Sequence, residues 1–262
     1  MFGPHLNATS GISSVVNKWL DAGLELNIDL EYISTLDEYV PKQYFKKTIN
    51  ALRSYKIFFI ESLRSIDIVH LHMSVGMSFY RKFIIFWLAK SRSIKVVVHL
   101  HGSTFKEFYS GGNGLRKKLI QSIFNNADGV FVLSKWWKEY IQELSTNKHI
   151  YIIYNGASID QFNQSLASVE KHKLKAIVIA FMGRLGERKG VYDLLDAFER
   201  LTLDIDNVKL VLGGDGDIEK CKTKAQALNI PKDLIKIEGE KTQKEVAKLM
   251  NKSDFFLLFS FN

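Results

Sequence analysis

AIVIAFMGRLGERKGVYDLLDAF, residues 176–198, contains one complete unit of the fold: an apolar run, a glycine-containing loop and an amphipathic helix. The run is rich in β-branched residues, which favours a buried strand. The spacing of Val191, Leu195 and Phe198 places one apolar stripe along the helix. A strand followed by a helix is half of a crossover unit, so this stretch predicts parallel strands connected by helices.

The same alternation extends in both directions along the chain. VHLHM in one early run is nearly repeated as VHLHG in the next, and the 29 residues from His70 to His99 suit adjacent strands of one crossover unit. The fold class is therefore α/β, with doubly wound parallel sheets. The runs expected to be strands are DIVHLH (67–72), KVVVHLH (95–101), GVFVLS (129–134), IYIIYNG (150–156), AIVIAFMG (176–183), VKLVLGG (208–214), LIKIEG (234–239) and DFFLLFS (254–260).

A polar stretch, DQFNQSLASVEKHKLK (160–175), interrupts the alternation and is typical of an interdomain linker. We place a domain boundary near residue 165, with one Rossmann-like lobe over 1–165 and a second over 166–262. The sequence begins close to the loop SGISS and stops at LLFSFN, directly after a strand. A sheet of this kind normally continues into a functional loop and helix, so we expect the second lobe to be incomplete.

Composition limits the class of protein. The chain has 262 residues, of which 46% are hydrophobic and 24% charged, as in ordinary globular proteins. Its longest apolar run, FIIFWLA (83–89), is far shorter than the roughly 20 residues that span a bilayer, and no secretory signal pattern is visible. The single cysteine, Cys221, excludes an internal disulfide, so we expect a cytoplasmic protein.

The chain is basic, with a formal net charge of +8, and residues 1–165 hold 19 Lys and Arg against 13 Asp and Glu. Such a surface is either simply solvated or contacts anionic lipid, nucleic acid or a phosphorylated substrate. No zinc finger or RNA-recognition pattern supports nucleic acid. Aromatic residues of this half suit either a lipid-linked acceptor or a buried core. The basic clusters are Lys46-Lys47, Arg81-Lys82 and Arg116-Lys117-Lys118, and the aromatic residues are Trp136, Trp137, Phe105, Phe108 and Tyr109.

The loop FMGRLGERKG (181–190) is the strongest candidate for a binding site. It joins a strand to a helix, and ligands of open α/β sheets bind outside the carboxyl ends of the strands. Gly183 allows close approach of the backbone, Arg184 and Lys189 can contact a diphosphate, and helix N-terminal amides favour anions. The alternative is a solvent-exposed basic loop. The absence of a P-loop or G-x-G-x-x-G pattern argues against standard kinases and dinucleotide dehydrogenases.

GGDGD (213–217) closes the next strand, and its glycines, Gly214 and Gly216, leave space beside a bound group. Asp215 and Asp217 form a D-x-D pair that could hold a divalent metal. An aspartate at a helix start is more commonly an N-cap, and we favour that interpretation.

Gly11, in SGISSVVNKWL near the start of the chain, precedes an apolar helical pattern. Its loop and the following amides form a second candidate anion site. An ordinary Ser-capped helix is the alternative interpretation of the same residues.

Two His-x-His pairs, starting at His70 and His99, lie on strands expected to be adjacent, and imidazoles brought together in this way could bind zinc. We expect no metal there, because histidines at strand ends more commonly satisfy local hydrogen bonds and no Cys or Asp completes a familiar ligand spacing. His101 differs, since a glycine and a serine follow it at the carboxyl end of a strand. A histidine in that place can meet a substrate hydroxyl.

Together these features resemble a nucleotide-sugar glycosyltransferase of the GT-B fold, most of all glycosyltransferase family 4. The resemblance covers most of the chain and rests on the ordered set of segments. In this family a paired-glutamate segment follows a strand and serine such as LLFS, and that segment is absent from the sequence, which ends at Asn262. The matching segments are SGISSVV, DIVHLH, VVVHLHGS, ADGVFVLSKWW, IIYNGASIDQF, FMGRLGERKGVYDLLDAF, GGDG and DFFLLFS.

The resemblance implies a first, acceptor-side lobe and a second lobe that binds a UDP-sugar or GDP-sugar. Arg184 and Lys189 are implied to bind the donor diphosphate, with Gly11 and Gly183 against it. His101 is implied to contact the transferred sugar as the catalytic residue. No metal or other cofactor is implied, because side-chain cations serve the leaving group. We assign four further residues to the donor pocket: Ser134, Asn155, Gly214 and Gly216.

The predicted activity is retaining transfer of a sugar from a nucleoside diphosphate to a glycan or lipid-linked acceptor, in bacterial surface polysaccharide or glycolipid synthesis. The predicted partners are the donor, the acceptor and an anionic membrane surface at the cytoplasmic face, without nucleic acid. The alternative is a catalytically inactive fragment or a nucleotide-sugar-binding scaffold.

Overall fold

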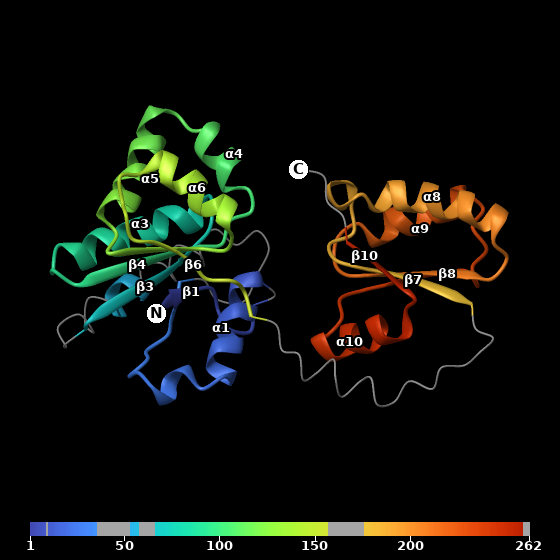
Figure 1. Cartoon of the computed structure of the whole chain (residues 1–262), viewed down its shortest axis with the longest axis horizontal. Coiled ribbons are helices and arrows are strands. Elements are labelled where there is room, and N and C mark those ends of the chain that lie inside the picture. The colour runs from blue at the N-terminus through green and yellow to red at the C-terminus, as the bar shows by residue number, and fades with distance from the viewer. Residues whose placement is uncertain (9, 36–52, 58–65, 157–175, 259–262) are drawn as a thin grey trace. The chain divides into compact units, whose positions relative to one another are not determined.

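The computed structural model describes residues 1–8, 10–35, 53–57, 66–156 and 176–258 (Figure 1). The chain divides into two units, Met1–Gly156 and Ala157–Asn262, and each has its own sheet and its own hydrophobic core. The predicted linker and the predicted boundary near residue 165 lie outside the described residues.

The sheet of the first unit has the strand order β2-β1-β3-β4-β5-β6, and its strands pair in parallel. Because β1 lies between β2 and β3, the direction in which the chain crosses the sheet reverses at β1. Such reversal points are where open α/β sheets bind ligands. The strands are β1 (Phe2–Gly3), β2 (Ile33–Ser34), β3 (Ile68–Met73), β4 (Lys95–Leu100), β5 (Gly129–Val132) and β6 (Ile150–Ile152).

Helices cover both faces of this sheet: α1 lies on one face, and α3, α5 and α6 lie on the other (Figure 1). Side chains of a strand alternate between the faces. Leu71 and Met73 of β3 are therefore buried in the main core, whereas His72 faces Trp19 of α1. The helices are α1 (Gly11–Asp21), η1 (Leu24–Leu26), α3 (Met77–Lys90), α4 (Phe105–Ser110), α5 (Gly114–Asn126) and α6 (Lys135–Leu144).

The second unit has a smaller parallel sheet of order β10-β7-β8-β9, with α8 and α9 on one face and α10 on the other (Figure 1). The crossing direction reverses at β7. Val191, Leu195 and Phe198 of α8 are buried, as their spacing predicts. The elements are β7 (Ile177–Met182), η2 (Glu187–Lys189), α8 (Val191–Asp204), β8 (Val208–Gly213), α9 (Ile218–Ala227), β9 (Ile235–Glu238), α10 (Gln243–Lys252) and β10 (Phe255–Leu257).

Two parallel sheets with helices on both faces confirm the predicted α/β, doubly wound class, and each run expected to be a strand forms one. The run 150–156 is a strand only over Ile150–Ile152. Within the described ranges, no helix combines the length and apolar character needed to cross a bilayer. The apolar run FIIFWLA lies in α3, where Ile85 and Phe86 are buried in the core.

Candidate functional site

The loop between β7 and α8, residues 183–190, is fastened to the loop after β8 by main-chain hydrogen bonds. Leu185 N donates to Asp215 O (2.6 Å), and Leu185 O accepts from Asp217 N (2.9 Å). The Leu185 side chain is buried, which anchors the centre of the loop in the core. The two loops predicted to form the site therefore lie together at the carboxyl ends of β7 and β8.

Gly214 and Gly216 are required by this contact between the loops. Gly214 has a φ of +138°, and a Cβ there would overlap the Gly183 carbonyl; Gly216 has a φ of +104°, and its Cβ would overlap the carbonyl of Leu185. A side chain at either position would be strained and would push the loops apart. These glycines thus have a role in loop packing, and their place in the donor pocket stays a prediction.

Arg184 and Lys189 lie on the same loop, at the reversal point of the second sheet. The Arg184 side chain is 72% exposed, and its Nη1 lies 3.9 Å from Asp215 Oδ2. An exposed pair of this kind is weak, so an incoming diphosphate can replace the aspartate. Lys189 is half-buried in η2, and α8 begins two residues later at Val191, where the N-cap residue Gly190 provides no side-chain cap. Two cations and an uncapped helix N-terminus together favour an anion.

Asp217 holds the N-cap position of α9, but its side chain makes no capping hydrogen bond. Its Oδ2 accepts from Tyr192 OH (2.9 Å) and lies 3.7 Å from Lys220 Nζ. Burial, and then this hydrogen bond, raise the pKa of Tyr192 to about 12. Asp217 therefore occupies the predicted N-cap position, but its carboxylate binds Tyr192 of α8 and does not cap the first turn of α9. Across the described residues, the groups suited to a metal include neither Asp215 nor Asp217.

Gly11 is the first residue of α1, beside the reversal point of the first sheet. Ser10 caps this helix, since its Oγ accepts from Ser13 N (3.0 Å). A Cβ built at Gly11 meets nothing within 4 Å, so packing does not require glycine there. The Ser-capped helix is confirmed, and contact of Gly11 with an anion stays a prediction.

His101 directly follows β4, and its backbone N donates to Met73 O (2.8 Å) at the end of β3. Its Nε2 lies 3.0 Å from Nδ1 of His72. Burial, and then the charge of Lys82, lower the pKa of His101 to about 4. The imidazole is therefore neutral at pH 7, with both a donor and an acceptor nitrogen, as contact with a sugar hydroxyl requires.

Sequence pattern does not reveal His72 as the hydrogen-bond partner of His101, and the prediction of a surface position is wrong for Lys82. Lys82 is 2% exposed, so it forms part of neither a solvated basic surface nor a lipid contact. Its position three residues after Phe79 and four before Phe86, on the buried side of α3, is the signal that could have identified it.

The other basic clusters have different outcomes. Arg116 lies 4.8 Å from the ring centroid of Phe108, and Lys117 Nζ lies 5.7 Å from that of Tyr109, so these two cations cover aromatic rings of their own unit. Lys46 and Lys47 lie outside the described residues.

Ser134 and Asn155 occupy the ends of two neighbouring strands. Ser134 follows β5 closely and caps α6, since its Oγ accepts from Trp137 N (3.3 Å). Asn155 is exposed, three residues after β6. The assignment of both residues to the donor pocket stays a prediction.

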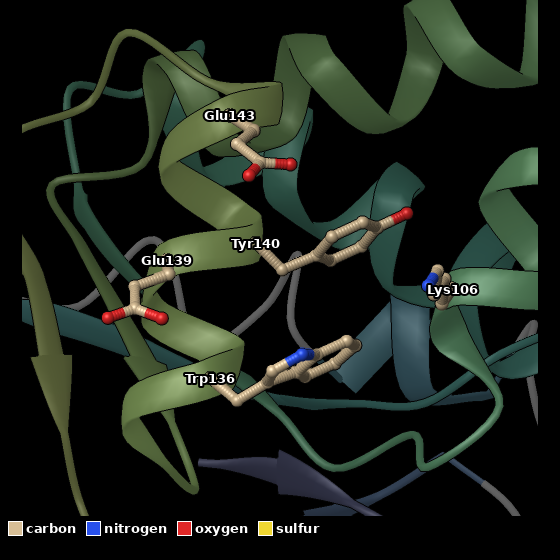
Figure 2. Close-up of a pocket in the computed structure, with 5 residues that line it drawn as sticks. All are labelled: Lys106, Trp136, Glu139, Tyr140 and Glu143. Carbon is tan, nitrogen blue, oxygen red and sulfur yellow. The ribbon is translucent and has the colours of Figure 1, made fainter. Parts of the chain in front are cut away.

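A pocket of about 260 Å³ lies beside α6 (Figure 2). Trp136 and Tyr140 project from α6 toward Lys106, with ring centroids 5.5 Å apart and an interplanar angle of 6°. Lys106 Nζ lies 5.7 Å from the Trp136 ring centroid, and Glu143 adds a carboxylate. Trp136 is 50% exposed. Of the other predicted aromatic residues, Phe105 is buried in the core and three pack partly buried against it: Phe108, Tyr109 and Trp137.

Family models match both halves of the chain. Residues 32–161 match the model described as Glycosyltransferase Family 4, and residues 163–262 match the model described as Glycosyl transferases group 1.

Among known sequences and structures, three similarities are informative. An uncharacterized glycosyltransferase of Methanocaldococcus jannaschii is 31% identical over 179 residues, which cover 64% of this chain and 45% of that protein. The alpha-monoglucosyldiacylglycerol synthase of Streptococcus pneumoniae is 23% identical over 237 residues, or 83% of this chain and 52% of that protein. This chain thus spans about half the length of the curated relatives it matches.

The crystal structure of Anabaena HepE in complex with UDP and glucose has a TM-score of 0.67 to this chain. Its sequence is 14% identical, and the similarity covers 99% of this chain and 73% of that chain. At this level of identity the likeness establishes the fold.

Proposed function

The chain belongs to the glycosyltransferases of the GT-B fold, and from this premise we propose that it uses a nucleoside-diphosphate sugar, with UDP or GDP, as its donor. The observation that carries the proposal is the loop 183–190, where Arg184, Lys189 and the uncapped start of α8 lie together. A diphosphate suits this site because it offers concentrated negative charge and several acceptor oxygens. The UDP named with HepE supports the same class of ligand.

The chemistry we propose is direct transfer with retention of the anomeric configuration. The bond from the anomeric carbon to the diphosphate oxygen breaks, and that carbon forms a bond to an acceptor hydroxyl oxygen, whose proton passes to the departing diphosphate. Arg184 and Lys189 stabilise the charge that grows on this leaving group. Arg184 offers a planar pair of N–H donors, and Lys189 a point charge. The neutral ring of His101 positions the sugar by a hydrogen bond to one of its hydroxyls.

We propose a lipid-linked or glycan acceptor, bound by the first unit at an anionic membrane surface. The name of the Streptococcus pneumoniae relative supports a glycolipid product. The pocket of Trp136, Tyr140 and Lys106 also supports an amphipathic acceptor, because aromatic faces pack on apolar groups while the amine binds oxygen.

Thermal unfolding with UDP, GDP and their sugars tests the donor site. A ligand at a hundred times its dissociation constant raises the free energy of unfolding by about 2.7 kcal/mol. For a chain of this size, that corresponds to a rise of about 5–10 °C in the midpoint temperature. We expect one nucleoside diphosphate to give this shift and NAD to give none. Arg184→Ala should weaken binding about 10- to 100-fold through loss of charge-assisted hydrogen bonds. Arg200→Ala, which removes an exposed cation from α8, is the matched control. Equal shifts in the Arg184→Ala protein and the wild type would reject the assignment.

Release of UDP or GDP from the sugar donor, measured with and without anionic vesicles that carry a diacylglycerol glycoside, tests the acceptor. Vesicle-stimulated release that falls in Trp136→Ala supports the lipid-linked acceptor. Release that soluble glycans stimulate equally well supports a glycan instead. Binding of the nucleotide without any release would identify the alternative, a nucleotide-sugar-binding scaffold.

A further inference from the structure

A cluster of histidines lies on the α1 side of the first sheet, outside the proposed donor loop. His70 and His72 come from β3, and His99 lies opposite His72 on β4. The indole of Trp19, from α1, covers all three rings, with centroid distances of 5.5–5.8 Å. Strand alternation and pairing register thus bring three imidazoles together against the indole of Trp19.

Each of His70, His72 and His99 offers one ring nitrogen, and these three nitrogens all lie within 4.8 Å of one another. Two nitrogens bound to one zinc at about 2.1 Å lie about 3.4 Å apart in a tetrahedral site, so the set must close by at most about 1.4 Å. Rotation of imidazoles about their side-chain bonds supplies a movement of this size.

Several of these nitrogens have no hydrogen-bond partner. Nε2 of His70 and both Nδ1 and Nε2 of His99 are buried without one in the described structure. The expectation that these histidines satisfy local hydrogen bonds is therefore wrong for His99. Leaving a buried polar group unpaired is unfavourable, so three such nitrogens in one cluster call for an explanation.

The donor set has the chemistry of a transition-metal site. The cluster offers one ring nitrogen from each of three histidines, and His72 and His99 are fully buried. Neutral imidazole is a preferred ligand of Zn²⁺, Cu and Ni ions. Met1 Sδ lies 3.3 Å from Nε2 of His72 and adds a soft donor beside the cluster.

We propose that His70, His72 and His99 bind one late first-row transition-metal ion, such as Zn²⁺, beneath Trp19. His101 is the outer partner, because its Nε2 lies 3.0 Å from Nδ1 of His72. With the metal on Nε2 of His72, Nδ1–H donates to His101 Nε2 and leaves the proton of His101 on its own Nδ1. The ion therefore joins β3 to β4 and fixes the tautomer of His101.

Metal titration of tag-free protein, stripped with EDTA and dialysed, tests this site. We expect one Zn²⁺ or Co²⁺ to bind per chain, and bound Co²⁺ to show the visible absorption of a tetrahedral nitrogen-ligated ion. Co²⁺ should also quench tryptophan fluorescence, and this quenching should be lost in Trp19→Phe. His101→Ala should weaken Zn²⁺ binding about 10- to 100-fold, as loss of an outer partner does. His70→Ala and His99→Gln each remove a ligand and should weaken it further.

His149→Ala is the matched control, because His149 is exposed and lies outside the cluster. It should bind Zn²⁺ as the wild type does. Circular dichroism identifies any variant that fails to fold, and the wild-type protein then decides the question alone by its stoichiometry and Co²⁺ spectrum. Absence of Zn²⁺ and Co²⁺ binding by the wild type, or equal affinity in the folded His70→Ala protein, overturns the proposal.

Discussion

Lys82 places a charge-bearing group inside the first unit. Its side chain is 2% exposed, and Nζ donates to Ser78 Oγ (3.0 Å). Burial, and then the neighbouring charge of Arg81, lower the pKa of Lys82 to about 7. Within the part of the chain that the structure describes, this ammonium has no carboxylate partner. Such a group costs stability when buried, because one hydroxyl does not replace its hydration shell.

Lys82→Met should therefore raise the free energy of unfolding at pH 7, by about 1–4 kcal/mol. Between pH 7 and 10.5 the unfolded chain holds a proton on Lys82 that the folded chain has lost. The wild type thus gains stability as pH rises through this window, and the advantage of the variant shrinks. Urea unfolding at pH 7 and pH 9 measures both effects. Lys118→Met, at an exposed site, is the control, and an equal gain there would contradict the argument.

Among the helices that the structure describes, α10 has a complete capping box at its N-terminus. Thr242 Oγ1 accepts from Glu245 N (3.3 Å), and Glu245 Oε2 accepts from Thr242 N (2.8 Å), which closes a capping box. The cap fixes the start of the helix that covers one face of the second sheet (Figure 1). T-Q-K-E at 242–245 is visible in the sequence as this signature.

Thr242→Ala should destabilise the second unit by about 1 kcal/mol, because the Glu245 N–H loses its acceptor and the Glu245 carboxylate loses the Thr242 hydroxyl. Urea unfolding measures the change. Thr223→Ala is the comparison, since Thr223 Oγ1 donates to Glu219 O within α9 and caps nothing. If Thr223→Ala lowers the free energy of unfolding as much as Thr242→Ala does, the capping hydrogen bonds do not account for the loss.

The sequence predicts elements better than it predicts partners. Runs of Val and Ile locate the strands, and the repeat of VHLH correctly places β3 beside β4. Local pattern could not reveal that Asp217 binds Tyr192, which lies 25 residues away on another helix. It also could not reveal the unpartnered nitrogens of His99, because these depend on what the surrounding elements leave uncontacted. Nonlocal packing decides both.

At the scale of the molecule, each unit places one candidate anion-binding residue where the chain reverses the direction in which it crosses its own sheet. Gly11 lies beside β1, and Arg184 follows β7. This much follows from sequence, since the order of strands and loops fixes the carboxyl edge of a parallel sheet. The two units keep separate cores, so they are separate units of stability as well.

Calorimetry should accordingly resolve two unfolding transitions. Val98→Ala, in the first core, should lower the midpoint temperature of one transition, and Leu212→Ala, in the second core, that of the other. Each substitution should reduce the free energy of unfolding of its own unit by about 2 kcal/mol or more. The donor nucleotide should raise most the transition that Leu212→Ala lowers, because Arg184 and Lys189 lie in that unit. A single transition that both variants lower would show that the units unfold as one.

The main-chain hydrogen bonds between the loops after β7 and β8 also make this region suitable for engineering. The partners are backbone atoms of Leu185, Asp215 and Asp217, so the path of the loop does not depend on the side chain at position 184. A combinatorial library can randomise positions 187 and 188 while Arg184 and the glycines at 214 and 216 stay fixed. Specificity for new donors could then be selected without first having to restore a lost fold.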